Sequence, residues 1–134
     1  MADPTMADTL FPTLRERFPH RGLRFESRPV PCAVFPAVHP DVGDIQVCDD
    51  GDEVTVYAGK FTHGHFSNYD EISGPEKRRI ISEDVVEFLD AVFTDQVIFW
   101  GSHGGGGGWH RLDFGPCEDP EPGEYVWSGP RNAI

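Results

Sequence analysis

The sequence predicts an α+β fold: a mainly antiparallel sheet of about five to seven strands, with one main helix at about residues 83–94 packed on one face and a short N-terminal helix. Residues 43–69 alternate between apolar and polar side chains in three successive runs, which is the period of strands with one buried face. Between residues 81 and 93, apolar side chains recur at helical spacing instead. Residues 97–100 form a continuous apolar run, which is typical of a central strand.

Length and composition bound the class of protein. A chain of 134 residues predicts a single domain, 1–134, with a loose N-terminus (1–9) and a tail rich in proline and acids (115–134). Ten phenylalanines and 38% hydrophobic residues indicate a globular protein. Neither a membrane span nor a secretory signal is expected. The three cysteines are widely spaced and form no CxxC motif, so we expect reduced thiols and a cytoplasmic location.

The N-terminal third contains weaker signals. Pro12 suits the first position of a short helix that Pro19 ends, with Leu14 and Phe18 facing inward. Residues 23–26 alternate and predict a strand. The next apolar segment, Cys32 to Phe35, lies among four prolines: Pro29, Pro31, Pro36 and Pro40. Because proline cannot donate to a β ladder, we expect this segment at a sheet edge or a strand start.

The acidic segment that follows predicts a hairpin continued by a third strand. Strands are expected at 45–48 and 54–58, with a turn in which Gly51 accepts a positive φ and the neighbouring aspartates cap their own turn. Gly59 allows a second bend before a strand at 61–66. In that strand His63 and His65 share one face, with their Cα atoms roughly 6–7 Å apart.

The C-terminal half predicts a helix and further strands. Ser82 is a candidate N-cap for the helix at 83–94, and a start at Pro75 is the alternative. A glycine-rich segment, 101–108, follows the central strand and joins it to an alternating run at 109–114, with one more short strand expected at 125–127. The glycines contain no GxGxxG or P-loop pattern, so we expect a hairpin connection or a mobile flap.

The charge distribution predicts a basic partner. The net charge of −12 argues against nucleic acid as a ligand, and residues 41–71 carry eight acids against one lysine. Such a concentration can steer association with a basic protein, although solubility alone is the simpler explanation. Tyr57 is the expected aromatic anchor, and Trp109 is a second aromatic candidate. The other expected contact residues are the acids of the hairpin: Asp49, Asp50, Asp52 and Glu53.

The two histidines predict a metal site as the alternative function. Two histidines and a carboxylate are a known ligand set for zinc or iron, and Glu71 or Asp70 lies close enough in sequence to complete it; His103 and His110 are more distant candidates. His63-Gly64-His65 followed by Glu71 is similar to the first cupin motif, which implies metal binding through these residues. The spacing departs from that motif, and a strong helix is not typical of a pure β-barrel. The simpler alternative is two sheet residues bonded to their neighbours.

These patterns lead to two functional hypotheses. The first is a non-enzymatic binding module, of the inhibitor or immunity type, that covers a basic partner and needs no cofactor. The second is a zinc- or iron-binding protein or metal-dependent enzyme centred on His63-Gly64-His65. No nucleophile motif is present, since Ser102 lies outside a GxSxG elbow. Whether the protein is an enzyme stays open at this stage.

Overall fold

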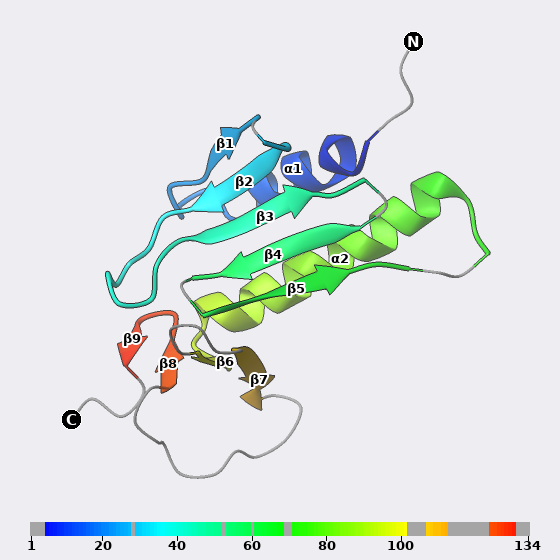
Figure 1. The fold of residues 1–134 in the computed structure, drawn as a ribbon. Helices are drawn as coiled ribbons and strands as arrows, with labels where there is room; N and C mark the ends of the chain where they lie inside the picture. The colour runs from blue at the N-terminus through cyan, green and yellow to red at the C-terminus, as the bar shows by residue number, and fades with distance from the viewer. Residues whose placement is uncertain are drawn as a thin grey trace.

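The computed structural model describes residues 5–27, 29–51, 53–59, 61–68, 71–101, 107–112 and 124–130. The predicted α+β class is confirmed: two helices accompany two antiparallel sheets (Figure 1). The helices are α1 (Met6–Arg17) and α2 (Gly74–Phe93). The strands are β1 (Arg24–Glu26), β2 (Cys32–Phe35), β3 (Ile45–Asp49), β4 (Val54–Ala58), β5 (Thr62–Phe66), β6 (Val97–Trp100), β7 (Gly108–Arg111), β8 (Glu124–Val126) and β9 (Gly129–Pro130).

The strands divide between two sheets on either side of α2 in the sequence. The first sheet is a five-stranded meander in the order β1-β2-β3-β4-β5. The second has the order β7-β6-β8-β9, so β6 is a central strand as predicted. It lies at the C-terminal end of α2 (Figure 1). A helix of 20 residues spans about 30 Å, which carries the chain from one end of the first sheet to the other before β6 begins.

The predicted hairpin and its third strand are confirmed. Val47 pairs with Val56 across β3 and β4, and β5 continues the meander. The turn between β3 and β4 closes where the amide of Asp50 donates to the carbonyl of Glu53 at 3.0 Å. Gly51 has a φ of +87°, a conformation that costs glycine little. The local turn chemistry therefore sets the register that places every side chain of β3 and β4.

Helix α1 begins earlier than predicted. We expected a loose N-terminus through residue 9 and a helix starting at Pro12, whereas the helix starts at Met6. Thr5 and Asp8 form a capping box, in which each side chain accepts from the other's backbone amide. Pro12 lies inside the helix on its exposed side, while the buried stripe consists of Met6, Leu10 and Leu14.

Helix α2 also begins earlier, at the alternative start. Ser73 is the N-cap and accepts a hydrogen bond from the amide of Glu76 at 3.3 Å, and Pro75 lies in the first turn. The prediction that Ser82 caps the helix is wrong, because Ser82 is an interior helical residue with 3% exposure. Within the described residues, neither helix combines the length and apolar character needed to cross a membrane.

Strand β2 is not at the edge of its sheet. It pairs with β1 on one side and β3 on the other, which corrects the edge position expected from the prolines. Pro31 and Pro36 lie just outside the strand, so no proline interrupts the ladder.

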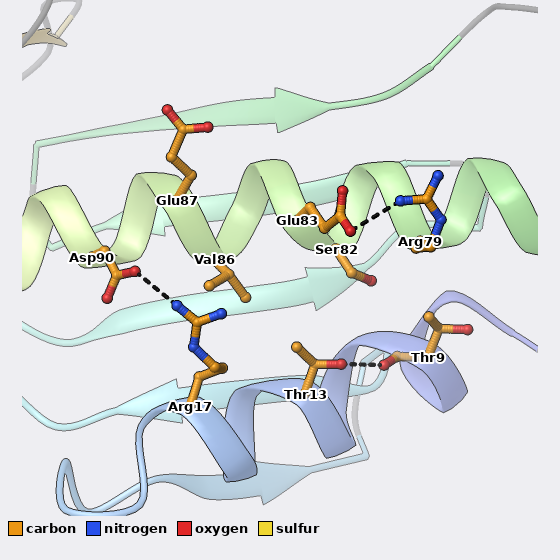
Figure 2. Close-up of a pocket in the computed structure, with 9 residues that line it drawn as sticks. All are labelled: Thr9, Thr13, Arg17, Arg79, Ser82, Glu83, Val86, Glu87 and Asp90. Atoms are coloured by element: carbon orange, nitrogen blue, oxygen red, sulfur yellow. Dashed lines mark hydrogen bonds and ion pairs between the residues drawn. The ribbon is translucent and has the colours of Figure 1, made fainter.

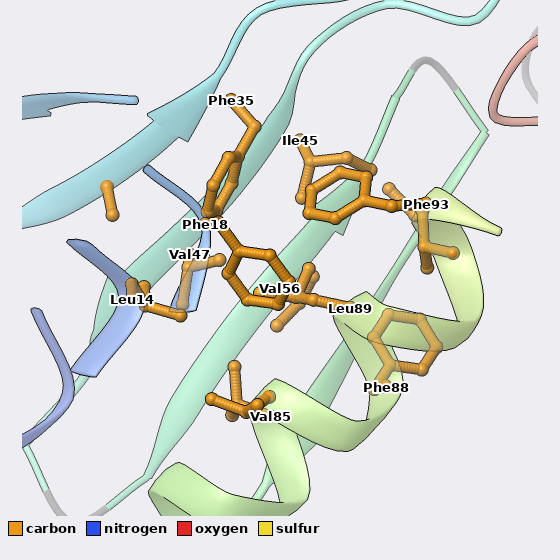
Figure 3. Packing of buried hydrophobic residues seen from close by; sticks show 14 of the residues in the cluster. Leu14, Phe18, Phe35, Ile45, Val47, Val56, Val85, Phe88, Leu89 and Phe93 are labelled. Atoms are coloured by element: carbon orange, nitrogen blue, oxygen red, sulfur yellow. The ribbon is translucent and has the colours of Figure 1, made fainter. Parts of the chain in front are cut away.

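The core lies between the first sheet and the two helices. Phe18, at the C-cap of α1, meets Phe35 of β2 and Phe93 of α2, and the three rings pack edge to face with centroids 5.1–5.7 Å apart (Figure 3). The apolar stripe of α2 is buried as predicted: Val85, Phe88, Leu89 and Val92. These side chains belong to the core between α2 and the first sheet, so the stripe determines how α2 packs on the sheet.

A disulfide joins two strands of the first sheet. Cys32 in β2 lies directly opposite Cys48 in β3, and the structure bonds their sulfurs across Cα atoms 4.2 Å apart. This corrects the expectation of reduced thiols, which rested on the odd number and wide spacing of the cysteines. The argument from free thiols for a cytoplasmic location therefore no longer holds.

The first prediction concerns the core. We expect Leu89→Ala to lower the free energy of unfolding by about 2–5 kcal/mol, because Leu89 has 0% exposure and truncation leaves a cavity. Urea titration would measure the loss, with Glu16→Ala on the exposed surface of α1 as the control. A loss no larger than that of the control would contradict the packing of α2 on the sheet.

The second prediction concerns the disulfide. Of the three cysteines, the two in the bond leave one, Cys117, to react with a thiol reagent in denaturant, and prior reduction should expose all three. Closing a loop with a sequence separation of 16 should contribute about 3 kcal/mol of stability, so Cys32→Ala with Cys48→Ala should unfold at lower urea concentration. Three reactive thiols without reductant would show that the bond is absent.

Candidate functional site

Both helices lie against the same face of the first sheet (Figure 1). The opposite face carries two rows of side chains across the strands. Directly opposed residues of neighbouring strands point the same way, so the register defines each row. The row nearer the β3–β4 turn contains Cys32, Cys48, Thr55 and His65, and the next contains Val34, Gln46, Tyr57 and His63. We call this surface the outer face. On its β4–β5 side Tyr57, His63 and His65 are exposed, whereas Thr55 is buried.

Gly64 determines which way the two histidines point. The indole of Trp109 lies against Gly64 on the helix-facing side of β5, where a Cβ atom would collide with the ring. Trp109 also packs on Phe88, with ring centroids 4.9 Å apart. His63 and His65 therefore project to the outer face, as the alternation predicted, with their own ring centroids 5.4 Å apart. The His-Gly-His pattern thus has a packing reason for its central residue.

His65 is the centre of a polar cluster at the end of the outer face. Its Nδ1 atom lies 3.1 Å from Oε1 of Glu53 and 3.1 Å from Oγ1 of Thr55. The Thr55 hydroxyl in turn donates to the carboxylate of Asp50. One potential ligand atom from each of Asp50, Glu53 and His65 lies within 4.8 Å of the others. We call these three residues the turn triad.

The turn triad differs from the ligand set predicted from the sequence. Of His63, His65 and Glu71, only His65 belongs to it. The ring of His63 instead packs against Tyr57, with centroids 5.6 Å apart, and Glu71 is exposed beyond β5. The other candidates are Asp70 and His103, which lie outside the described residues, and His110, which lies in β7 of the second sheet.

The acidic residues of the hairpin have separate environments. Asp49 is buried, and its carboxylate accepts from the amide of Gly51 at 2.9 Å and from that of Ala7, in the first turn of α1, at 3.0 Å. It therefore links the turn to the helix N-terminus, where a negative charge is favoured. Asp52 lies outside the described residues. Asp50 is exposed and Glu53 is half-buried, so these two offer carboxylates to an approaching cation.

The two aromatic candidates also differ in exposure. Tyr57 is 43% exposed in the middle of the outer face, although β4 has neighbours on both sides. Trp109 is partly buried and packs against the hydrophobic core. Tyr57 is consequently the aromatic side chain that a partner on this face would meet. The glycine-rich connection lies mostly outside the described residues.

A separate groove of about 430 Å³ runs between α1 and α2, lined by nine residues: Thr9, Thr13, Arg17, Arg79, Ser82, Glu83, Val86, Glu87 and Asp90 (Figure 2). Ion pairs border it, from Arg17 to Asp90 at 3.3 Å and from Arg79 to Glu83 at 2.9 Å. The Ser82 hydroxyl is buried without a hydrogen-bond partner. Both arginines are thus paired with carboxylates, and the third carboxylate of the lining, Glu87, is paired with Arg111 at 3.3 Å. The groove therefore offers no unpaired charge, and we do not take it as the functional site.

Sequence reasoning missed Thr55 and the groove for the same reason. Thr55 lies ten residues before His65, and only the β4–β5 register places the two opposite each other. The groove depends on how two helices distant in sequence come together. Neither has a local pattern that could have identified it.

The third prediction tests the contact behind the histidine strand. Gly64→Ala should lower the free energy of unfolding by about 1–3 kcal/mol, because the added methyl group overpacks against Trp109. His63→Ala, one residue away on the exposed face, should change stability by less than about 0.5 kcal/mol. Thermal or urea unfolding of both variants would measure the difference. Equal stabilities would mean that Trp109 does not pack on β5.

Comparison of the chain with protein-family models, with curated proteins and with solved structures gave no match. The similarity of residues 59–71 to a cupin motif therefore gains no support beyond the residues themselves.

Proposed function

We propose that the protein is a binding module that uses the outer face of its first sheet to dock a basic protein. The observation that carries this proposal is the position of Tyr57, an aromatic side chain 43% exposed on an inner strand, on the face opposite the two described helices. Tyrosine is enriched at binding hot spots because it combines a large apolar area with a polar tip. It is the natural anchor for a partner on this surface.

The charge around the anchor favours a cationic partner. Asp50 and Glu53 lie at the turn next to the outer face, and the whole chain carries a net charge of −12. Complementary charge speeds encounter and fixes the orientation of docking. The contribution of Asp49 is indirect, since its carboxylate is occupied by two backbone amides. The proposed contact surface is therefore Tyr57 with Asp50 and Glu53, and it is smaller than the acidic cluster predicted from the sequence.

The proposal implies a salt-sensitive, Tyr57-dependent interaction, which is the fourth prediction. Cross-linking and affinity capture from native lysate, followed by mass spectrometry, should recover a protein of high isoelectric point with the wild type. Recovery should fall with Tyr57→Ala and with Asp50→Asn combined with Glu53→Gln. It should also fall as salt rises past physiological strength, where the screening length is about 8 Å.

A charge-matched control separates docking from general attraction. Asp41→Asn combined with Glu16→Gln removes the same amount of charge from exposed positions outside the proposed contact surface, and should leave recovery unchanged. Chelator is present throughout, so that bound metal has no part in the result. Equal recovery with every variant, or no basic protein recovered with the wild type, would contradict the proposal.

A further inference from the structure

We propose that the turn triad, Asp50, Glu53 and His65, binds a divalent transition-metal ion of the zinc class. One ligand atom from each residue lies within 4.8 Å of the others. Zinc bound by nitrogen and oxygen ligands at 2.0–2.2 Å needs those atoms about 3.3 Å apart in a tetrahedral site. The three side chains are exposed or half-buried, and rotamer changes that move their ligand atoms by roughly an ångström would bring the separations from up to 4.8 Å to the required value. The site therefore requires no movement of the strands.

The backbone already directs the three side chains toward one point. The turn is closed by the bond from the Asp50 amide to the Glu53 carbonyl, which brings both acids to the same end of the hairpin. His65 reaches this end from β5, because its strand position lies opposite Thr55. One local turn and one long-range strand pairing thus bring the ligands together.

Thr55 acts as a positioning residue between the ligands. Its buried hydroxyl donates to the Asp50 carboxylate and so receives a hydrogen bond from Nδ1–H of His65, 3.1 Å away. Nδ1 also faces Glu53 at 3.1 Å. A metal ion bound to Nδ1 would take the place of that proton among the same partners, and the neutral ring would then carry its proton on Nε2. Residues that orient metal ligands in this way typically affect affinity by about 10–100-fold.

The electrostatic balance favours a cation at this point. With His65 neutral, the two carboxylates leave a formal charge of −2. No arginine or lysine in the described part of the chain forms an ion pair with Asp50 or Glu53. A divalent ion would offset this charge. The imidazole favours zinc, iron or copper over magnesium and calcium, which prefer oxygen ligands alone.

This inference goes beyond the docking function and does not depend on it. It also differs from the ligand set expected from the sequence, because His63 and Glu71 are not members of the triad. With three protein ligands, a tetrahedral ion keeps one position for water or another ligand.

The fifth prediction uses zinc chloride as the probe and the neighbouring histidine as the control. Isothermal titration of metal-free protein should show one zinc ion bound per chain. His65→Ala and Glu53→Gln should each weaken binding at least about 10-fold, as expected for loss of a ligand. His63→Ala and Tyr57→Ala should keep wild-type affinity. Cobalt titration should give the absorption bands of a low-symmetry site, and His65→Ala should lose them.

Several results would overturn the assignment. They are absence of saturable zinc uptake by the wild type, equal affinity of His65→Ala and wild type, and an equal loss with His63→Ala. Zinc binding that excess magnesium abolishes would also overturn it, because it would show binding by carboxylates without the imidazole. The variants lie at exposed or half-buried surface positions, and circular dichroism would verify that each is folded. Tyr57→Ala separates the two proposals, since it should weaken docking and leave zinc binding intact.

Discussion

Both helices lie against the same face of the five-stranded sheet (Figure 1), and this arrangement separates the residues of β3 and β4 that fill the core from those on the outer face. Side chains alternate along a strand, so every residue is committed either to the core or to the outer face. Val47 and Val56 fill the core between sheet and helices. Tyr57, His63 and His65 have no such cover, and their chemistry is available to solvent and to ligands.

Two contacts tie the outer face to the rest of the molecule. The Asp49 carboxylate bonds both the β3–β4 turn and the first turn of α1, so α1 fixes the position of the turn that carries Asp50 and Glu53. Trp109 presses on Gly64 and connects the second sheet to the strand that carries His65. The turn triad thus forms where three parts of the fold meet. A change in either contact should move its ligands relative to one another, even though neither contact lies on the outer face.

Local patterns were sufficient for the meander, because alternation and turn residues act over a few positions. Val54, Val56 and Ala58 are buried as the period of two predicted. The two helix starts have a local pattern as well, since Thr5 with Asp8 and Ser73 with Glu76 have the spacing of a capping box. The predicted starts at Pro12 and Ser82 rest on weaker local preferences than these pairs.

The remaining differences depend on long-range pairing that no short pattern encodes. Cys32 lies opposite Cys48 because of the register of β2 and β3. The Asp49 carboxylate reaches the Ala7 amide because α1 packs beside the β3–β4 turn. The candidate site shows the same division. The sequence identified His65, Asp50 and Glu53 separately, under two different hypotheses, and the strand register brings them together.

Both proposed sites require the β4–β5 side of the outer face to be open in solution, whereas Cys32, Val34 and Cys48 on its β2–β3 side are buried. Hydroxyl-radical footprinting of the native, oxidised protein would test this by comparing two aromatic residues in one experiment. Tyr57 should be modified rapidly, while Trp127, which is 3% exposed, should be protected until the protein unfolds. Protection of Tyr57 equal to that of Trp127 would show that another part of the chain or a second molecule covers this face, and would contradict the account.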